Sequence, residues 1–372
     1  MSIKTKQQQA STKKELFFAL FIFAFSFLLY SNTLHHGFVM DDGAVITNHS
    51  TVQKGVSGII ELFEQSSVYG STKENFGSYR PLTMSFFAIE KQFFGSNSNG
   101  YHAIQILLYS ILCVLLYILL KKIIKDFHPL LPFITILLFI SHPIHTEVVA
   151  NIKSADEILC LLFASLATLF AFRFIETSRK FNSGISFLFF LCALFSKENA
   201  TTFLLLIPMT LYFFSPASKK NILLIFSTYA IATLAFLMVR FATLDKAPEN
   251  ISIINNALIS ANSFSERYAT ISLHFLNYLR LLCFPANLCW DYSYNQIPIV
   301  NFNNPLSIFS TLIIFFGLFF SLRVFFKMKR NNIDEHTHPK PIIEIIFLLH
   351  FIFHTITIAE FQHLYFNWSH TG

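Results

Sequence analysis

Ten apolar runs constrain the fold of this chain more than any other feature of its sequence. They lie at about 15–34, 103–120, 130–142, 157–175, 185–195, 200–214, 221–243, 268–285, 305–327 and 341–359. A helix needs about 20 residues to cross the hydrocarbon core of a bilayer. Backbone groups inside a membrane must also bond to one another, which leaves helices and closed barrels. Repeated runs of this length predict an all-α, polytopic membrane protein.

Composition also favours a membrane protein over a soluble one. Hydrophobic residues make up 53% of the 372 residues, and charged residues make up 13%. A soluble domain carries about 25% charged residues, so this chain has too little charge to cover a water-facing surface. The net charge of +6 comes mainly from basic residues in short loops between the runs. Such clusters are topology signals, and we expect no nucleic-acid partner.

The basic clusters also predict the orientation in the bilayer. They lie in the N-terminal tail 1–14 and near 121–125, 173–180, 219–220 and 327–330. The positive-inside rule makes these segments cytoplasmic, so the long loop 35–102 faces the other side. To keep 327–330 inside, the run at 268–285 must not cross the membrane. We therefore expect about nine transmembrane helices and an interfacial or re-entrant helix near 268–285.

Two adjacent carboxylates, Asp41 and Asp42, follow the first apolar run. A carboxylate at the membrane surface can take a proton from an acceptor while a lipid-anchored donor approaches from the bilayer. Adjacent side chains on an extended or turn backbone point in different directions, so we expect the two acids to differ in role. We favour Asp42 as a general base and Asp41 as a supporting carboxylate. The alternative is a pair of solvated acids at a helix end.

Two further motifs on the same side carry charge. Tyr79 and Arg80 precede a proline, and a guanidinium can bind a phosphate through two hydrogen bonds. The alternative is an arginine that reaches lipid headgroups. Lys197 and Glu198 interrupt an apolar stretch, where a lysine needs a phosphate or a carboxylate. Neutralisation by each other or by neighbouring groups fits the sequence equally well.

A third motif combines His142, His145 and Glu147. Two imidazoles three residues apart on a helix could bind zinc, but Pro143 disturbs a regular helix and the order is not that of a zincin. We therefore expect no metal site; a divalent cation is compatible with the motif but not indicated by it. Contact with phosphate or sugar, with Glu147 as the orienting group, fits better than a polar junction between helices.

The last outer segment carries Arg267 and Asp291 on either side of the run at 268–285. A helix lying on the membrane with basic and aromatic residues suits a lipid-phosphate substrate. Simple membrane anchoring is the alternative for each of these residues.

Taken together and in order, these motifs resemble a known family. They read GFVxDD at 37–42, YRPL at 79–82, Gly95 through Tyr101-His102, HPIHTEVVA at 142–150, SKENA at 196–200, and RxxT followed by LxxPxxLxxDYS up to Ser293. The chain resembles the transmembrane and tetratricopeptide-repeat (TMTC-type) protein O-mannosyltransferases and their bacterial relatives. Those proteins belong to the GT-C superfamily of polytopic glycosyltransferases.

The resemblance implies transfer of mannose or a similar hexose from a polyprenyl- or dolichyl-phosphate donor to a protein hydroxyl, with inversion, on the non-cytoplasmic face. It implies the endoplasmic reticulum membrane in a eukaryote or the inner membrane in a bacterium. The first-loop acid would be the base, and Arg80, His142, His145, Glu147 and Lys197 would contact the donor. A non-catalytic carrier or scaffold for lipid-linked sugars is the alternative. A transporter is disfavoured because the sequence shows no related halves.

The chain departs from the family pattern towards its C-terminus. A repeat of about 34 residues is absent from the sequence, and the segment 331–372 is rich in histidine. We expect a cytoplasmic tail at 1–14, a GT-C-like domain at 15–330 and a divergent segment at 331–372. The change in composition favours a truncated or frameshifted end over a metal-binding cluster.

Overall fold

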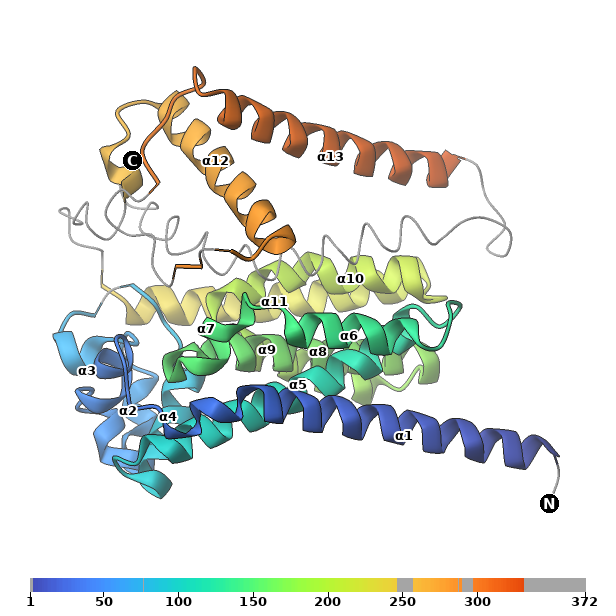
Figure 1. Ribbon diagram of the computed structural model, residues 1–372, viewed down its shortest axis with the longest axis horizontal. Coiled ribbons are helices and arrows are strands. Elements are labelled where there is room, and N and C mark those ends of the chain that lie inside the picture. The colour runs from blue at the N-terminus through green and yellow to red at the C-terminus, as the bar shows by residue number, and fades with distance from the viewer. Residues whose placement is uncertain (1–2, 76, 246–256, 287, 290–296, 331–372) are drawn as a thin grey trace. The chain divides into compact units, whose positions relative to one another are not determined.

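The computed structural model describes most of the chain, and every regular element in the described part is a helix. The described residues are 3–75, 77–245, 257–286, 288–289 and 297–330. Over these residues the predicted all-α class is confirmed. The chain divides into two compact units, Met1–Lys246 and Ala247–Gly372, so the predicted domain at 15–330 contains parts of both (Figure 1).

The first unit contains most of the helices. Its longer helices are α1 (Ile3–Tyr30), α4 (Pro81–Phe94), α5 (Ser98–Ile123), α6 (Leu131–Ser141), α8 (Ala155–Thr177), α9 (Lys180–Ser196), α10 (Phe203–Phe214) and α11 (Lys219–Thr243). Its shorter elements are η1 (Ser31–His35), η2 (Gly43–Thr47), η3 (Val52–Gly58), α2 (Ile59–Leu62), α3 (Tyr69–Thr72), α7 (His145–Ala150), η4 (Ile152–Ser154) and η5 (Glu198–Thr202). The predicted tail at 1–14 is helical from its third residue, because α1 continues through it.

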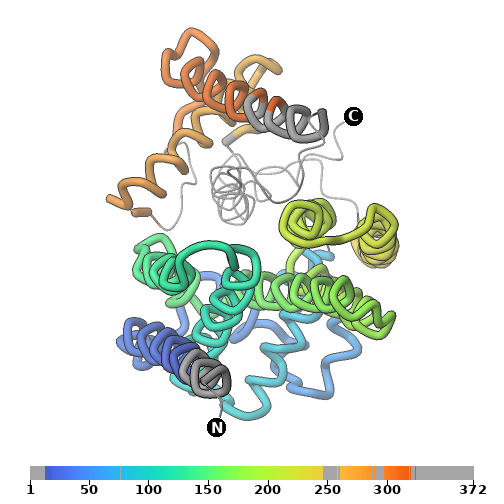
Figure 2. Tube along the Cα trace, turned by 90° about the vertical axis from the view of Figure 1, so that its right-hand side faces the viewer, coloured from blue at the N-terminus to red at the C-terminus, as the bar shows by residue number. Residues whose placement is uncertain are grey.

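The long helices of the first unit pack side by side. Helix α1 packs against α5, α5 against α8, α8 against α9, and α9 against α11, and both views show them running roughly alongside one another (Figures 1 and 2). Small residues let α8 approach its neighbours closely: Ala164, Ala167 and Ala171 are fully buried. Ser186 of α9 donates a hydrogen bond to the carbonyl oxygen of Ala167 at 2.7 Å. Small residues at interfaces are typical of helix packing in membranes.

Within the described part of the chain, four helical segments are long and apolar enough to cross a membrane, judged by length and composition. They are Lys13–His35, Ser98–Ile123, Ile152–Thr177 and Lys219–Thr243. Among the described residues, shorter apolar helices lie at Leu131–Ser141 and Lys180–Ser196, and an apolar segment, Pro305–Gly317, opens the last described helix. The nine predicted spans are therefore not confirmed, and the run at 341–359 lies outside the described residues. Helix α6 is only about 16 Å long, roughly half of the ~30 Å hydrocarbon core, because His142 and Pro143 follow its end.

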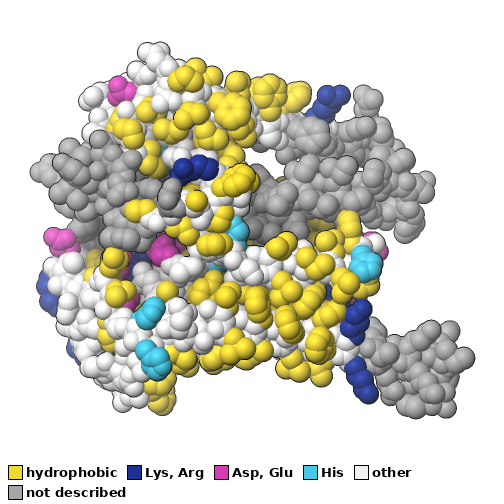
Figure 3. All heavy atoms as spheres, viewed as in Figure 1, with side chains coloured by type: hydrophobic (Ala, Val, Ile, Leu, Met, Phe, Trp, Pro, Cys, Tyr) yellow, Lys and Arg dark blue, Asp and Glu magenta, His cyan; other side chains and the backbone are white. Residues whose placement is uncertain are grey.

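The surface of the helical bundle suits a lipid environment. Large apolar side chains are exposed along the long helices, among them Leu28 on α1, Ile118 on α5 and Met238 on α11. On the face shown in Figure 3, hydrophobic side chains spread over the helices of the first unit. In water such an area would be an association surface; around membrane helices it is the surface that contacts lipid.

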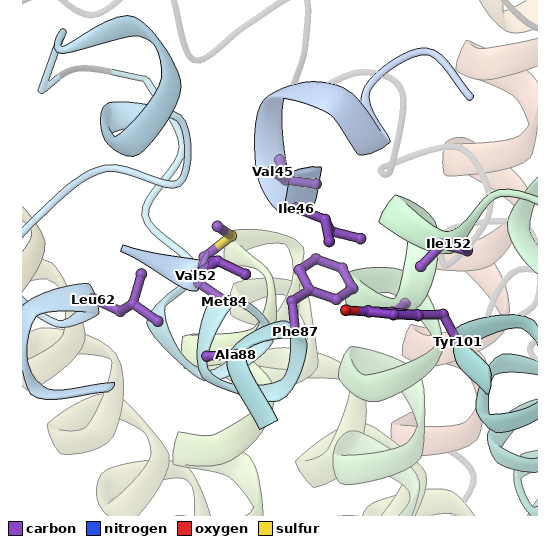
Figure 4. Close-up of a cluster of buried hydrophobic side chains, with 10 residues drawn as sticks. Val45, Ile46, Val52, Leu62, Met84, Phe87, Ala88, Tyr101 and Ile152 are labelled. Carbon is purple, nitrogen blue, oxygen red and sulfur yellow. The ribbon is translucent and has the colours of Figure 1, made fainter. Parts of the chain in front are cut away.

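The segment between α1 and α5, called the first loop below, folds mainly into short helices at one end of the bundle (Figure 1). Its apolar core includes Val52, Met84 and Phe87, and the same cluster contains Tyr101 from the start of α5 and Ile152 from η4 (Figure 4). The first loop therefore packs on the ends of two membrane helices. This shared core fixes the position of the first-loop acids relative to the start of α8.

The second unit contains η6 (Ala257–Ser260), α12 (Phe264–Cys283) and α13 (Pro305–Arg330). Helix α12 is amphipathic and does not meet the criteria for a membrane span, as expected for the run at 268–285. Ser272 of α12 donates a hydrogen bond to the carbonyl oxygen of Ser307 on α13 at 3.1 Å. The interfacial position of α12 stays a prediction.

Candidate functional site

Asp42 joins the first loop to the start of α8. Its side chain is fully buried; Oδ2 accepts a hydrogen bond from Val39 N at 2.9 Å, and Oδ1 accepts one from Lys153 N at 2.8 Å. Burial raises the pKa of the Asp42 carboxyl above its ordinary value, and the two N–H groups oppose part of that rise. Both carboxyl oxygens are occupied by backbone groups, so this side chain holds two segments together.

Asp41 lies in different surroundings. Its side chain is 66% exposed, and its Oδ2 lies 3.8 Å from Nζ of Lys153. The preceding residue, Met40, has a φ of 47°, a left-handed conformation that costs roughly 1–2 kcal/mol for a residue with a side chain. This turn leaves one acid in the interior and the other at the surface. Of the two adjacent acids, Asp41 is thus the one that an acceptor in solution can reach.

Five charged side chains form a second cluster, which is almost fully buried. Arg80 lies 2.5 Å from Asp156 through Nη1 and 3.0 Å from Glu198 through Nε. Lys197 pairs with Glu157 and lies 3.5 Å from Asp156. Only Glu157 has a side chain that is more than a tenth exposed. Two cations and three carboxylates from distant parts of the sequence therefore neutralise most of one another's charge.

The pKa values in this ion-pair cluster follow from the pairing. Burial by itself would lower the pKa of the Arg80 guanidinium, but Glu198 and Asp156 outweigh burial and raise it. In the same way, Asp156 and Glu157 raise the pKa of Lys197 against the effect of burial. Burial would raise the pKa of Glu198, but Arg80 and nearby backbone N–H groups lower it. All three groups are therefore charged at neutral pH.

Local sequence explains why these side chains meet. Arg80 is the residue before α4, and Pro81 starts that helix with the fixed φ that suits a first turn. Lys197 is extended where α9 ends. Asp156 and Glu157 lie in the first turn of α8, where a helix dipole favours negative charge. The cluster thus gathers the ends of three helices.

Tyr79 stabilises the same region through hydrogen bonds. Its ring is fully buried, its backbone N–H donates to Oε1 of Glu198 at 2.7 Å, and its hydroxyl donates to the carbonyl oxygen of Phe63 at 2.7 Å. Tyr79 therefore links the first loop to the segment after α9.

The histidine motif is divided between interior and surface. His145 is buried against Phe139, with 4.1 Å between ring centroids, and burial lowers its pKa to about 3. It is neutral at physiological pH and offers no positive charge to a phosphate. His142 accepts a hydrogen bond from Ile144 N at 3.3 Å, and Glu147 is exposed on α7. In the described part of the chain, no group of three His, Cys, Asp or Glu residues is placed to hold a metal ion.

The two remaining predicted residues lie in the second unit. Arg267 is half-buried on α12, and Asp291 lies outside the described residues. Their predicted contact with a lipid phosphate stays a prediction.

Three residues of this region were missed by sequence analysis: Lys153, Asp156 and Glu157. Acidic residues at the start of a membrane helix are costly unless they have partners, and that signal could have identified Asp156 and Glu157. No sequence signal singles out Lys153, because its contact with Asp41 depends on the fold of the first loop.

Over the described residues, the fold and these clusters define a helical membrane protein whose buried charges gather at one end of its helices. The chain is similar to a protein O-mannosyl-transferase of Caenorhabditis elegans, with 26% identity over 301 residues, or 80% of this chain and 42% of that protein. It is 35% identical to TMTC1 of Homo sapiens over 191 residues, or 48% of this chain and 21% of TMTC1. It is 25% identical to TMTC2 of Homo sapiens over 351 residues, or 86% of this chain and 40% of TMTC2.

These similarities confirm the predicted resemblance to the TMTC-type protein O-mannosyl-transferases. The chain spans less than half the length of these relatives. No family model and no solved structure matches it.

Proposed function

We propose that the chain is a membrane glycosyltransferase that moves mannose or a similar hexose from a polyprenyl- or dolichyl-phosphate donor to a protein hydroxyl. The observation that carries the proposal is the similarity, over 80% of the chain, to a protein named as an O-mannosyl-transferase. The proposal includes a GT-C-like arrangement of about nine spans with the site on the non-cytoplasmic face. The relatives named above are animal proteins, which favours the endoplasmic reticulum membrane over a bacterial inner membrane.

In this proposal Asp41 is the general base. It accepts the proton of the acceptor hydroxyl, the hydroxyl oxygen attacks the anomeric carbon, and the bond from that carbon to the phosphate oxygen breaks. The electron pair stays on the phosphate, and direct attack inverts the anomeric centre. The exposed carboxylate of Asp41 supports this assignment over our preference for Asp42, because both oxygens of Asp42 already accept backbone hydrogen bonds. Asp42 is then a positioning residue.

We further propose that Tyr79, Arg80, Lys197 and Glu198 position the outer segments, in place of the direct substrate contact that the motifs suggested. The support is that each of the two cations already has buried carboxylate partners. A donor phosphate would have to displace those partners and leave a carboxylate buried without a cation, which is strongly unfavourable.

The test is sugar transfer in membranes from cells that express the full chain, with a panel of radiolabelled polyprenyl-phosphate sugars. Wild type is compared with Asp41→Asn, matched for expression and membrane insertion. We expect transfer by the wild type with at least one donor and its loss in the variant. A wild type that binds a donor without transferring its sugar would contradict the proposal and favour a carrier or scaffold for lipid-linked sugars.

A further inference from the structure

We infer that Lys153 holds the phosphate of the lipid-linked donor beside Asp41 and stabilises that phosphate as it leaves. The inference rests on the proposed function and adds a residue that the sequence motifs did not identify. Two observations carry it, the partners of the basic residues and the fixed backbone of Lys153, together with a chemical argument about the movement of charge in the proposed reaction.

The basic residues near the first loop differ in how they are paired. Arg80 and Lys197 are buried, and each has a carboxylate partner within 3.0 Å. Lys54 is on the surface and pairs with Glu61 at 2.5 Å. Lys153 is the basic residue that contacts Asp41, at a longer distance of 3.8 Å and with a side chain that is 18% exposed. It is therefore a cation next to the candidate base whose carboxylate contact is loose enough to be exchanged for a phosphate.

The backbone of Lys153 is fixed by hydrogen bonds, while its flexible side chain extends towards Asp41. Its N–H donates to Oδ1 of Asp42 at 2.8 Å and to Oδ1 of Asn151 at 3.2 Å. The neighbouring Ile152 is buried in the apolar core shared with the first loop (Figure 4). A fixed backbone places the ammonium group on a flexible four-carbon stem close to Asp41. Phosphate can thus be bound without movement of the main chain.

The proposed reaction needs a cation at this place. Before transfer, Asp41 is negative and the donor is a phosphodiester with one negative charge. After transfer, Asp41 carries the acceptor proton, and the departing prenyl phosphate carries a second negative charge. One negative charge therefore moves from Asp41 to the phosphate. Lys153 lies close enough to stabilise that charge both before and after transfer. A contact that strengthens as charge develops on the leaving group raises the rate of transfer more than it raises donor affinity.

The experiment measures binding of a short-chain, water-soluble prenyl phosphate to the purified full chain in lipid nanodiscs, alongside sugar transfer. The variants are Lys153→Gln, Lys153→Arg and Asp41→Asn, with Lys54→Gln as a control that removes a lysine from the first loop. Inorganic phosphate and the prenyl alcohol are tested separately, so that recognition of the phosphate is distinguished from binding of the lipid chain.

We expect Lys153→Gln to weaken prenyl-phosphate binding by roughly 10- to 100-fold, the range for loss of one charged hydrogen bond. Transfer should fall at least as much, Lys153→Arg should recover part of both, and Lys54→Gln should change neither. Asp41→Asn should bind the phosphate at least as well as wild type, because a competing negative charge is gone, yet fail to transfer sugar.

A Lys153→Gln protein that is as thermally stable as wild type and binds prenyl phosphate equally well would overturn the inference. In that case Lys153 acts only on Asp41. Normal transfer by this variant would also refute the inference while leaving the proposed function intact. A wild type that neither binds prenyl phosphate nor transfers sugar would refute both.

Discussion

Two charged clusters at one end of the helical bundle contain the same kinds of groups in opposite settings. Arg80, Asp156, Lys197 and Glu198 are buried, with contacts as short as 2.5 Å. Asp41 and Lys153 meet near the surface at 3.8 Å. A buried pair cannot lose one partner without leaving a desolvated charge, whereas an exposed pair can exchange a partner for a ligand. The first cluster is therefore suited to holding the fold and the second to chemistry.

The largest effect that separates the two clusters should come from Asp41→Asn. If Asp41 is the general base, its loss should lower the rate of transfer by roughly 10²- to 10⁴-fold. Thermal stability should stay near that of wild type, because the side chain is mostly exposed. The measurements are initial transfer rates and thermal unfolding of the purified protein. A stable variant with a wild-type rate would end the assignment of Asp41 as base.

The next largest effect should come from the buried cluster. Arg80→Met leaves Glu198 and Asp156 without their closest cation, and removal of one partner from a buried pair costs about 3–5 kcal/mol. We expect a large loss of thermal stability and of folded protein in the membrane. The double variant Arg80→Met/Glu198→Gln should regain part of that stability, because it removes one of the stranded charges.

This prediction would be contradicted if Arg80→Met were as stable as wild type but transferred sugar poorly with a raised KM for the donor. Arg80 would then bind the donor, as the YRPL motif first suggested. The two outcomes distinguish a structural role of Arg80 from direct contact with the substrate.

Asp42→Asn should have a smaller effect on stability. The amide keeps the shape of the side chain, but its nitrogen cannot accept the hydrogen bond from Val39 N or Lys153 N. An unsatisfied buried donor costs about 1–3 kcal/mol. Thermal unfolding measures this loss, and Asp42→Glu serves as the variant that keeps the charge. Transfer abolished by Asp42→Asn in a protein of unchanged stability would favour Asp42 as the base.

The sequence predicted local features of this contrast well, but not the contacts between residues that are far apart in the chain. Helices α5, α8 and α11 coincide with apolar runs of 18 to 23 residues. Hydropathy alone therefore predicted the bounds of these helices to within a few residues. The motifs also predicted that Tyr79, Arg80, Lys197 and Glu198 lie on one side of the membrane, and the structure brings these residues together. Their partners could not be assigned, because Arg80 meets Asp156 and Glu198 across 76 and 118 residues of chain.

The roles of the two first-loop acids were also beyond the reach of sequence. Which of two adjacent carboxylates is buried depends on the left-handed turn at Met40, and a methionine gives no signal for such a conformation. The expected phosphate partner for Lys197 shows the same limit, since carboxylate and phosphate satisfy an ammonium group equally well. Burial and distance decided between them, and neither is encoded locally.

A buried acid without a cation provides a pH test of the same contrast. Glu90 of α4 is buried, and its Oε2 has no hydrogen-bond partner among the described residues. Burial raises its pKa to about 9, whereas Arg80 and nearby backbone N–H groups lower the pKa of the equally buried Glu198. Between the pKa of an unfolded glutamate and about 9, the folded protein holds one proton more than the unfolded chain. Stability should therefore fall as pH rises through this window.

Glu90→Gln should remove that pH dependence and stabilise the protein at pH 8 by roughly 1 kcal/mol, the lower end of the cost of burying a poorly paired polar group. The measurement is the thermal midpoint from pH 5 to pH 9, with Glu64→Gln as a control on an exposed side chain of the first loop. A midpoint that falls equally steeply in Glu90→Gln and wild type would show that another group carries the dependence.

The smallest effect should come from an exposed ion pair that resembles the buried Arg80–Asp156 pair only in its contact distance. Lys54 lies 2.5 Å from Glu61, as close as Arg80 lies to Asp156, but the side chains of Lys54 and Glu61 are 50% and 45% exposed. Exposed pairs contribute about 0–1 kcal/mol, and salt screens them further. Lys54→Gln should therefore change the thermal midpoint little at low salt and not at all at 1 M salt. If Lys54→Gln destabilised the protein as much as Arg80→Met does, contact distance rather than burial would determine the strength of these pairs. The division into a buried cluster that holds the fold and an exposed pair that does chemistry would then lose its physical basis.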